Sequence, residues 1–207
     1  MINYVNQKTL ILWDMERRVV MEVRRFKPED ASKVLSWLTN EREFRMWAAD
    51  SYDKYPLEPQ EMVNSYLKRI TESEFYPLTF EEKGKVIGHL ILRYPTSDKK
   101  NIRLGYIIVD KKKRGKGLGS KMILEAMKYA VNNLGATKFN LGVFTNNLQA
   151  YKCYTKIGFK PIKIKKGAFD FHGEKWDWEE MLYNPYEKIY DLVKSGIIDP
   201  ILQGNYF

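Results

Sequence analysis

The residues that can do chemistry gather in two stretches of the second half of the chain. The first, KKKRGKGLGS over 111–120, holds five cations and three glycines. Alternate glycines let backbone N–H groups converge on a ligand, because no Cβ stands in the way. An amphipathic pattern follows directly, and the N-terminus of such a helix adds unpaired N–H groups and partial positive charge. The stretch is therefore suited to cradle a pyrophosphate.

Other interpretations of this cationic stretch are a solvated charged surface, a nuclear import signal or a nucleic-acid patch. Its position between an apolar strand and an amphipathic helix favours the phosphate site. Two familiar phosphate loops fail on spacing. The P-loop needs Gly-Lys after a four-residue gap from its first glycine, where this chain has Ser120-Lys121. The G-x-G-x-x-G fingerprint would need its last glycine at Ser120 or Met122.

The second stretch lies on the next predicted helix, over 147–159. Its pattern is Asn147-x-x-Ala150-x-x-x-Tyr154-x-x-x-Gly158-Phe159. An Asn at this place can cap the helix, and a Gly can end it. A Tyr on an amphipathic helix is commonly a packing residue, so Tyr154 has that alternative beside any catalytic one.

Together the two stretches resemble the GNAT superfamily of N-acetyltransferases. Arg114-x-x-Gly117-x-Gly119, after a strand that ends in Val-Asp, is similar to the acetyl-CoA loop of that family, and the pattern at 147–159 matches its next motif. The resemblance is specific over 101–161 and extends over roughly 21–183. It implies acetyl-CoA as cosubstrate and Tyr154 as the catalytic residue, since a phenol can protonate the thiolate that leaves when an amine attacks a thioester.

The same resemblance implies which residues hold acetyl-CoA. The loop and the helix start would bind the pyrophosphate, and the backbone of the preceding strand would pair with the pantetheine arm. The N–H near Val109 would face the thioester oxygen, and the Asn147 side chain would touch the pantetheine. The predicted set is Ile108, Val109, Arg114, Gly115, Lys116, Gly117, Leu118, Gly119, Ser120, Asn147 and Tyr154.

The group that takes the proton from the amine is not identified by the sequence. Many GNAT enzymes carry a Glu on the strand before the loop, whereas NIRLGYIIVD has Arg103 and no carboxylate in that part. Glu43, Asp50 and Asp53 lie in the segment that usually walls the acceptor side, where a solvated surface position is the alternative role. Aromatic residues of that segment either line an acceptor pocket or pack the helices, namely Phe44, Trp47, Tyr52 and Tyr55.

Thiol and metal chemistry have little support in the sequence. Cys153 is the only cysteine, and it points about 100° away from Tyr154 around the helix. The only histidines, His89 and His172, are far from it in the chain, so a buried apolar role is predicted for Cys153. One Cys and two separated His give no metal-ligand spacing, so no metal is predicted. A lone cysteine fits a reducing compartment, most simply the cytoplasm.

The order of the strands and helices expected around these residues predicts an α/β single domain with a mixed, mostly antiparallel sheet flanked by helices. Apolar periodicity predicts strands over 19–26, within 76–95 (two) and over 101–110, and helices over 27–47 and 56–71. Beyond the loop it predicts a helix over 118–134, a strand over 138–144, a helix over 146–158 and a hairpin of 159–167 with 174–183. The predicted domains are an extension (1–20), the GNAT-like unit (21–183) and a helical appendage (184–207) with a helix near 186–193.

Charge is unevenly distributed between the two parts of the chain. Residues 1–80 carry 12 Lys/Arg and 13 Asp/Glu, whereas 81–207 carry 23 and 13. A cationic amine suits the near-neutral first part better than the basic second part. No apolar run approaches the ~20 residues of a membrane span. The expected partners are acetyl-CoA and an amine, without nucleic acid or membrane, and a homodimer is a possible assembly.

The predicted activity is acetyl transfer from acetyl-CoA to an amine by direct attack in a ternary complex. A protein N-terminus, a lysine and a small-molecule amine are all open as acceptors. One alternative is a non-catalytic acyl-CoA-binding sensor with the same fold. A less supported one is a nucleic-acid-binding module that uses the cations of 111–116, which explains the charge but neither the glycines nor the pattern at 147–159.

Overall fold

The computed structural model describes residues 21–185 of the chain. The predicted N-terminal extension and the predicted helix near 186–193 lie outside the described residues. The first described strand begins at Met21 and the last ends at Tyr183. The domain boundaries themselves stay a prediction.

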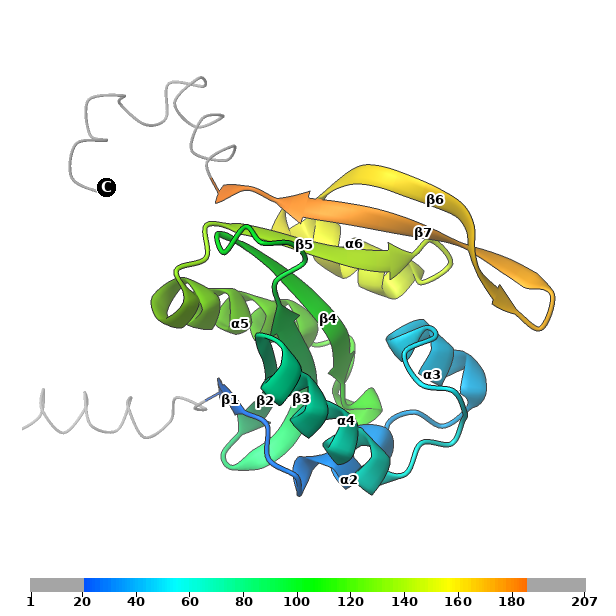
Figure 1. Ribbon diagram of the computed structural model, residues 1–207, viewed down its shortest axis with the longest axis horizontal. Coiled ribbons are helices and arrows are strands. Elements are labelled where there is room, and N and C mark those ends of the chain that lie inside the picture. Colours follow the sequence, from blue (N-terminus) through cyan, green and yellow to red (C-terminus); the bar gives the residue numbers. More distant parts are fainter. Residues whose placement is uncertain (1–20, 186–207) are drawn as a thin grey trace, which may run out of the picture.

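A seven-stranded sheet forms the centre of the described chain, in the order β1-β2-β3-β4-β5-β7-β6. All neighbours are antiparallel except β4 and β5, which run parallel. The prediction of a mixed, mostly antiparallel α/β fold is confirmed (Figure 1). The strands are β1 (Met21–Arg25), β2 (Phe75–Glu82), β3 (Lys85–Arg93), β4 (Asn101–Val109), β5 (Lys138–Phe144), β6 (Lys160–Phe171) and β7 (Glu174–Tyr183).

Helices cover both faces of the sheet, and an apolar core lies on each face. Along β3, Leu90 and Leu92 belong to the core under α5, whereas Ile91 belongs to the core under α2–α4. Side chains alternate along a strand, so these two cores lie on opposite faces. The helices are α2 (Asp30–Leu35), α3 (Glu41–Ala48), α4 (Pro59–Glu72), α5 (Leu118–Leu134) and α6 (Leu148–Ile157), with a 3₁₀ turn at Lys111–Lys113.

The single helix predicted over 27–47 is wrong, because the chain forms α2 and α3 with a break at 36–40. The side chain of Asn40 accepts a hydrogen bond from the Glu43 N–H at 2.9 Å and so starts a new helix. The Glu43 carboxylate in turn accepts from the Thr39 N–H at 3.0 Å. These two local bonds satisfy N–H groups at the start of α3, which is why the chain turns here instead of continuing α2.

The two parallel strands are paired only near their beginnings. The register joins Asn101–Arg103 of β4 to Lys138–Asn140 of β5 and stops there, although β4 continues to Val109 and β5 to Phe144. The rest of the two strands diverges, as Figure 1 shows. Ligands of open α/β sheets bind beyond the carboxyl ends of parallel strands, so this divergence is where a site is expected.

Candidate active site

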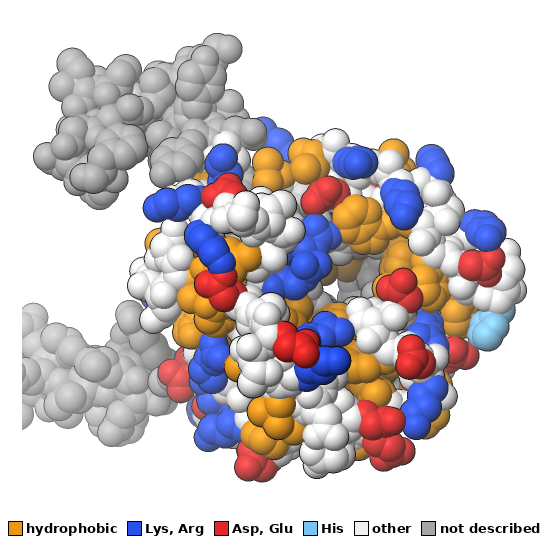
Figure 2. Space-filling model, in the orientation of Figure 1, with side chains coloured by type: hydrophobic (Ala, Val, Ile, Leu, Met, Phe, Trp, Pro, Cys, Tyr) orange, Lys and Arg blue, Asp and Glu red, His pale blue; other side chains and the backbone are white. Residues whose placement is uncertain are grey.

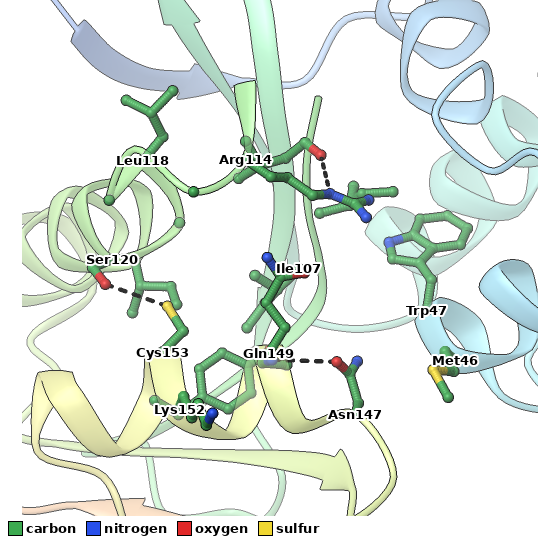
Figure 3. A pocket seen from close by; sticks show the side chains of 18 of the residues that line it. Met46, Trp47, Ile107, Arg114, Leu118, Ser120, Asn147, Gln149, Lys152 and Cys153 are labelled. Atoms are coloured by element: carbon green, nitrogen blue, oxygen red, sulfur yellow. Dashed lines mark hydrogen bonds between the residues drawn. The ribbon is translucent and has the colours of Figure 1, made fainter. Parts of the chain in front are cut away.

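A cavity of about 640 Å³ lies where β4 and β5 diverge. It is bordered by the end of β4, the glycine loop with the start of α5, one face of α6 and one face of α3 (Figure 3). The space-filling view shows the surface hollowed between α3 and β4 (Figure 2). All of the residues predicted to bind the cofactor line this cavity except Lys116. The structure therefore brings the two sequence motifs together on one site.

The glycine loop presents backbone to the cavity because two of its glycines adopt left-handed conformations. Gly115 has φ +78° and Gly117 has φ +74°, values that residues with a Cβ rarely adopt. Gly117 is also the N-cap of α5. The first intrahelical bond runs from the Lys121 N–H to the Gly117 carbonyl at 3.1 Å, so the N–H groups of the preceding first turn have no helical partner. This arrangement is suited to bind an anion.

The end of β4 turns one peptide face toward the cavity. The Asp110 N–H donates to the Ile87 carbonyl of β3 at 2.9 Å, so Asp110 faces β3. Backbone groups alternate along a strand, so those of Val109 point the other way. The Val109 carbonyl accepts from Arg114 Nε at 3.2 Å on the cavity side. Ile108 pairs with His89 of β3, so Ile108 contributes its side chain but not its peptide to the cavity.

Tyr154 lies on α6 with its side chain against the cavity and is only 6% exposed. Burial raises the pKa of its phenol well above the ordinary value, and the neighbouring Cys153 adds to the shift. The hydroxyl therefore stays protonated at neutral pH. A buried, protonated phenol beside a cavity can donate a proton or a hydrogen bond to a bound group.

Asn147 and Cys153 hold α6 in place at the cavity. The Asn147 side chain accepts from the Ala150 N–H at 3.2 Å and caps the helix, as its position predicted. Cys153 is half-buried rather than fully buried, and its Sγ lies 3.3 Å from Ser120 Oγ of α5 (Figure 3). Neither histidine is its partner, because His89 contacts Tyr66 and His172 contacts Glu41.

The model of the acetyltransferase (GNAT) family matches residues 35–159, more than half of the chain. The chain belongs to the GNAT family. It is 28% identical to spermine/spermidine N(1)-acetyltransferase of Bacillus subtilis (strain 168) over 115 residues, which are 53% of this chain and 73% of that protein. It is 30% identical to thialysine N-epsilon-acetyltransferase of Mus musculus, over 49% of this chain and 62% of that one.

A solved structure with a similar fold is spermidine N-acetyltransferase from Vibrio cholerae in complex with CoA and spermine. The TM-score is 0.69 and the identity 20%, over 82% of this chain and 98% of the other. The expectation of an N-acetyltransferase of the GNAT type, an acyltransferase, is thereby confirmed.

One wall of the cavity is formed by α3. Glu43, Met46 and Trp47 recur at three- and four-residue spacing and line the cavity, whereas Asp50 and Asp53 do not. Among the aromatic candidates Trp47 lines the cavity. The other three, Phe44, Tyr52 and Tyr55, pack in the core under the helices. The packing alternative therefore holds for these three, and an acceptor pocket at Trp47 stays a prediction.

Glu43 is held in its ionised form by its surroundings. Partial burial raises the pKa of this carboxyl, but hydrogen bonds from Lys111 Nζ at 2.7 Å and from Thr39 outweigh it, so the pKa lies below its ordinary value. A carboxylate with a lowered pKa is a weak general base. The Lys111 ammonium balances its charge, so a cationic amine that binds Glu43 would share this carboxylate with Lys111 or displace it.

Arg103 lies in the part of β4 where many GNAT enzymes carry a glutamate. Arg103 Nη1 donates to Asn140 Oδ1 at 2.8 Å and to Glu180 Oε1 at 3.0 Å, which joins β4 to β5 and β7.

Several cavity residues carried no sequence signal because they lie between motif positions, such as Ile107, Gln149 and Lys152. Within the described chain no group of three or more His, Cys, Asp or Glu could hold a metal, and no helix is long and apolar enough to cross a bilayer.

Proposed function

We propose that this enzyme transfers the acetyl group of acetyl-CoA to an amine by direct attack in a ternary complex. The observation that carries the proposal is the convergence of three groups on one cavity: the glycine loop before α5, the outward peptide of Val109 and the buried phenol of Tyr154. The crystallised Vibrio cholerae relative, which contains CoA, supports the choice of donor.

The donor half of the cavity fits the parts of acetyl-CoA in order. The left-handed glycines and the first turn of α5 offer N–H groups to the pyrophosphate, and an added Cβ at Gly115 or Gly117 meets no atom within 4 Å, so the space beside the loop is open. Arg114, Lys152 and Lys156 line the same half and add positive charge. The pantetheine arm would then lie along the free edge of β4 toward Val109.

The reaction divides among these residues. The nitrogen of the uncharged amine attacks the thioester carbon, a C–N bond forms, and negative charge develops on the carbonyl oxygen. The Val109 N–H donates a hydrogen bond to that oxygen. The C–S bond then breaks, and the Tyr154 hydroxyl supplies a proton or hydrogen bond to the departing sulfur. The extra proton of the amine leaves to solvent, from which the phenol is reprotonated.

The acceptor enters on the side of α3, where Glu43 is the only carboxylate among the described residues that line the cavity. A primary alkylamine is cationic before it reacts, so it can pair with the Glu43 carboxylate beside Lys111 or in its place. The relatives named as spermine/spermidine and thialysine acetyltransferases make polyamines and lysine-like amines the first acceptors to test. A protein N-terminus stays open. The cytoplasmic location, a homodimer and the absence of nucleic-acid partners stay predictions.

Donor binding can be tested without knowing the acceptor. Acetyl-CoA and CoA should bind in the micromolar range or tighter and raise the melting temperature, because a ligand of the folded state stabilises it by mass action. Binding should weaken with added salt, because cations of the loop meet the phosphates of the cofactor. A melting temperature that does not respond to millimolar CoA would contradict the proposal.

A further inference from the structure

An irregularity in β4 decides which peptide faces the cavity. Gly105 pairs with Ile91 of β3 and Ile108 pairs with His89, so two residues of β4 face one residue of β3. Such a β-bulge shifts the alternation of the strand by one residue. A regular strand would pair Ile107 with His89, and the peptide of Ile108 instead of Val109 would point to the cavity.

The bulge needs support from outside the strand. Tyr106 lies in it with φ +49°, a conformation that residues other than glycine rarely adopt and that persists only where the surroundings fix it. The Tyr106 carbonyl accepts from the indole Nε1–H of Trp47 at 2.8 Å. Its hydroxyl accepts from Arg69 Nη1 at 2.7 Å, and its ring stacks on Tyr66 with centroids 6.3 Å apart. Helices α3 and α4 therefore hold Tyr106 at both ends.

Trp47 differs from the other supports because it also lines the cavity. Its ring lies 5.1 Å from the Tyr106 ring and stacks on Tyr52 at an interplanar angle of 8°, so the indole N–H is aimed rather than free to turn. We propose that Trp47 is a positioning residue for acetyl transfer: its indole N–H holds the β4 bulge in the register that points the Val109 N–H at the thioester carbonyl. This inference rests on the proposed function.

The test compares one substitution at two tryptophans. Trp47→Phe removes the indole N–H and keeps an aromatic ring against Tyr106. Trp37→Phe is the matched control, because Trp37 packs in the same core, is 3% exposed, and has an Nε1 without a hydrogen-bond partner among the described residues. It also lies outside the cavity lining. Both variants must bind acetyl-CoA with near wild-type affinity, because the loop that holds the pyrophosphate is unchanged.

The first readout is the infrared carbonyl stretch of bound acetyl-CoA labelled with ¹³C at the thioester carbon. A hydrogen bond from the Val109 N–H lowers this frequency in the wild type. Trp47→Phe should return it toward the value of free acetyl-CoA, and Trp37→Phe should leave it unchanged. The second readout is kcat, which should fall roughly 10- to 100-fold in Trp47→Phe alone, because a misplaced oxyanion donor loses most of its effect.

Three results would overturn the inference. The first is an unchanged carbonyl frequency and kcat in Trp47→Phe. The second is a loss of kcat in Trp37→Phe as large as the loss in Trp47→Phe. The third is a wild-type protein in which the carbonyl frequency of bound acetyl-CoA is not lowered. If the wild type binds no acetyl-CoA at all, the proposed function fails first. If Trp47→Phe does not fold, replacing Trp47 by 3-benzothienylalanine exchanges the indole N–H for sulfur in a ring of nearly the same shape, and an unchanged carbonyl frequency in that variant would overturn the inference as well.

Discussion

The two walls of the cavity are built by different means. The proposed donor wall is mainly backbone, with left-handed glycines, the first turn of α5 and the free edge of β4. The proposed acceptor wall consists of side chains of α3, namely Glu43, Met46 and Trp47. Backbone sites tolerate few residue types at fixed spacing, whereas a side-chain wall can be made in many ways. The donor wall therefore carries a recognisable sequence pattern and the acceptor wall carries none.

Charge follows the same division. Among the described residues that line the cavity, the cations Arg114, Lys152 and Lys156 belong to the donor loop and α6, and the single carboxylate belongs to α3. Under the proposed function, a phosphate-bearing donor would bind on the cationic side of the cavity and a cationic acceptor on the side of α3. Changes to one wall should affect one substrate, which the following variants test.

The largest effect is expected from Gly117→Val, on the donor wall. Gly117 has φ +74°, and valine would force the loop out of that conformation and turn its N–H groups away. We expect the variant to fold and to show no measurable CoA binding when it is titrated with CoA in a calorimeter.

Gly84→Val is a matched control for this variant, because Gly84 has φ +73° and open space around it but lies in the turn between β2 and β3. The two variants should be strained alike, and only Gly117→Val should lose CoA. Retained CoA affinity in Gly117→Val would show that the loop is not the cradle.

A smaller effect, confined to turnover, is expected from Tyr154→Phe. The hydroxyl is removed while the ring still packs, so the free energy of unfolding should change by no more than about 1 kcal/mol. If the phenol assists the leaving thiolate, kcat should fall by roughly 10²-fold with acetyl-CoA affinity nearly unchanged. Turnover and CoA affinity are measured on the same folded sample.

Tyr151→Phe is the control, since Tyr151 lies on the same helix but does not line the cavity. It should keep wild-type turnover. Full activity in Tyr154→Phe would leave the donor site intact and remove Tyr154 from the mechanism.

The smallest effect is expected on the acceptor wall, from Glu43→Gln. Removing one partly exposed charge should raise the KM of a cationic amine about fivefold. This factor corresponds to about 1 kcal/mol, the interaction energy of two unit charges in contact in water. The Kd of acetyl-CoA should stay unchanged. Glu41→Gln, on the same helix but outside the cavity, should change neither value. An equal effect of Glu43→Gln on acetyl-CoA and amine would contradict the division between the walls.

The sequence predicted the two helices that follow the glycine loop well, because each helix boundary has a local cause. Gly117 and Gly135 bound a long amphipathic helix, and Asn147 and Gly158 bound the next one, so caps and spacing located both motifs. The predicted succession of strands and helices along the chain followed from apolar periodicity and turns in the same way.

The acceptor side depends on contacts between residues far apart in the chain. Gly105 inside the strand pattern is a local signal of a bulge at Tyr106, but the sequence does not show that the support comes from Trp47 and Arg69 on two other elements. The break between α2 and α3 had a local signal in Thr39-Asn40, but apolar spacing on both sides concealed it. Tertiary contacts that a pattern search cannot see therefore account for most of what the sequence missed.

The most direct test of acetyl transfer is release of the CoA thiol from acetyl-CoA against a panel of amines that includes spermidine, spermine, a lysine analogue and a peptide with a free N-terminus. The account predicts thiol release that requires an amine, together with an equal amount of the acetylated amine by mass spectrometry. Thiol release no faster than without amine for every class of acceptor, in a protein that binds acetyl-CoA, would contradict it and favour a non-catalytic acyl-CoA sensor.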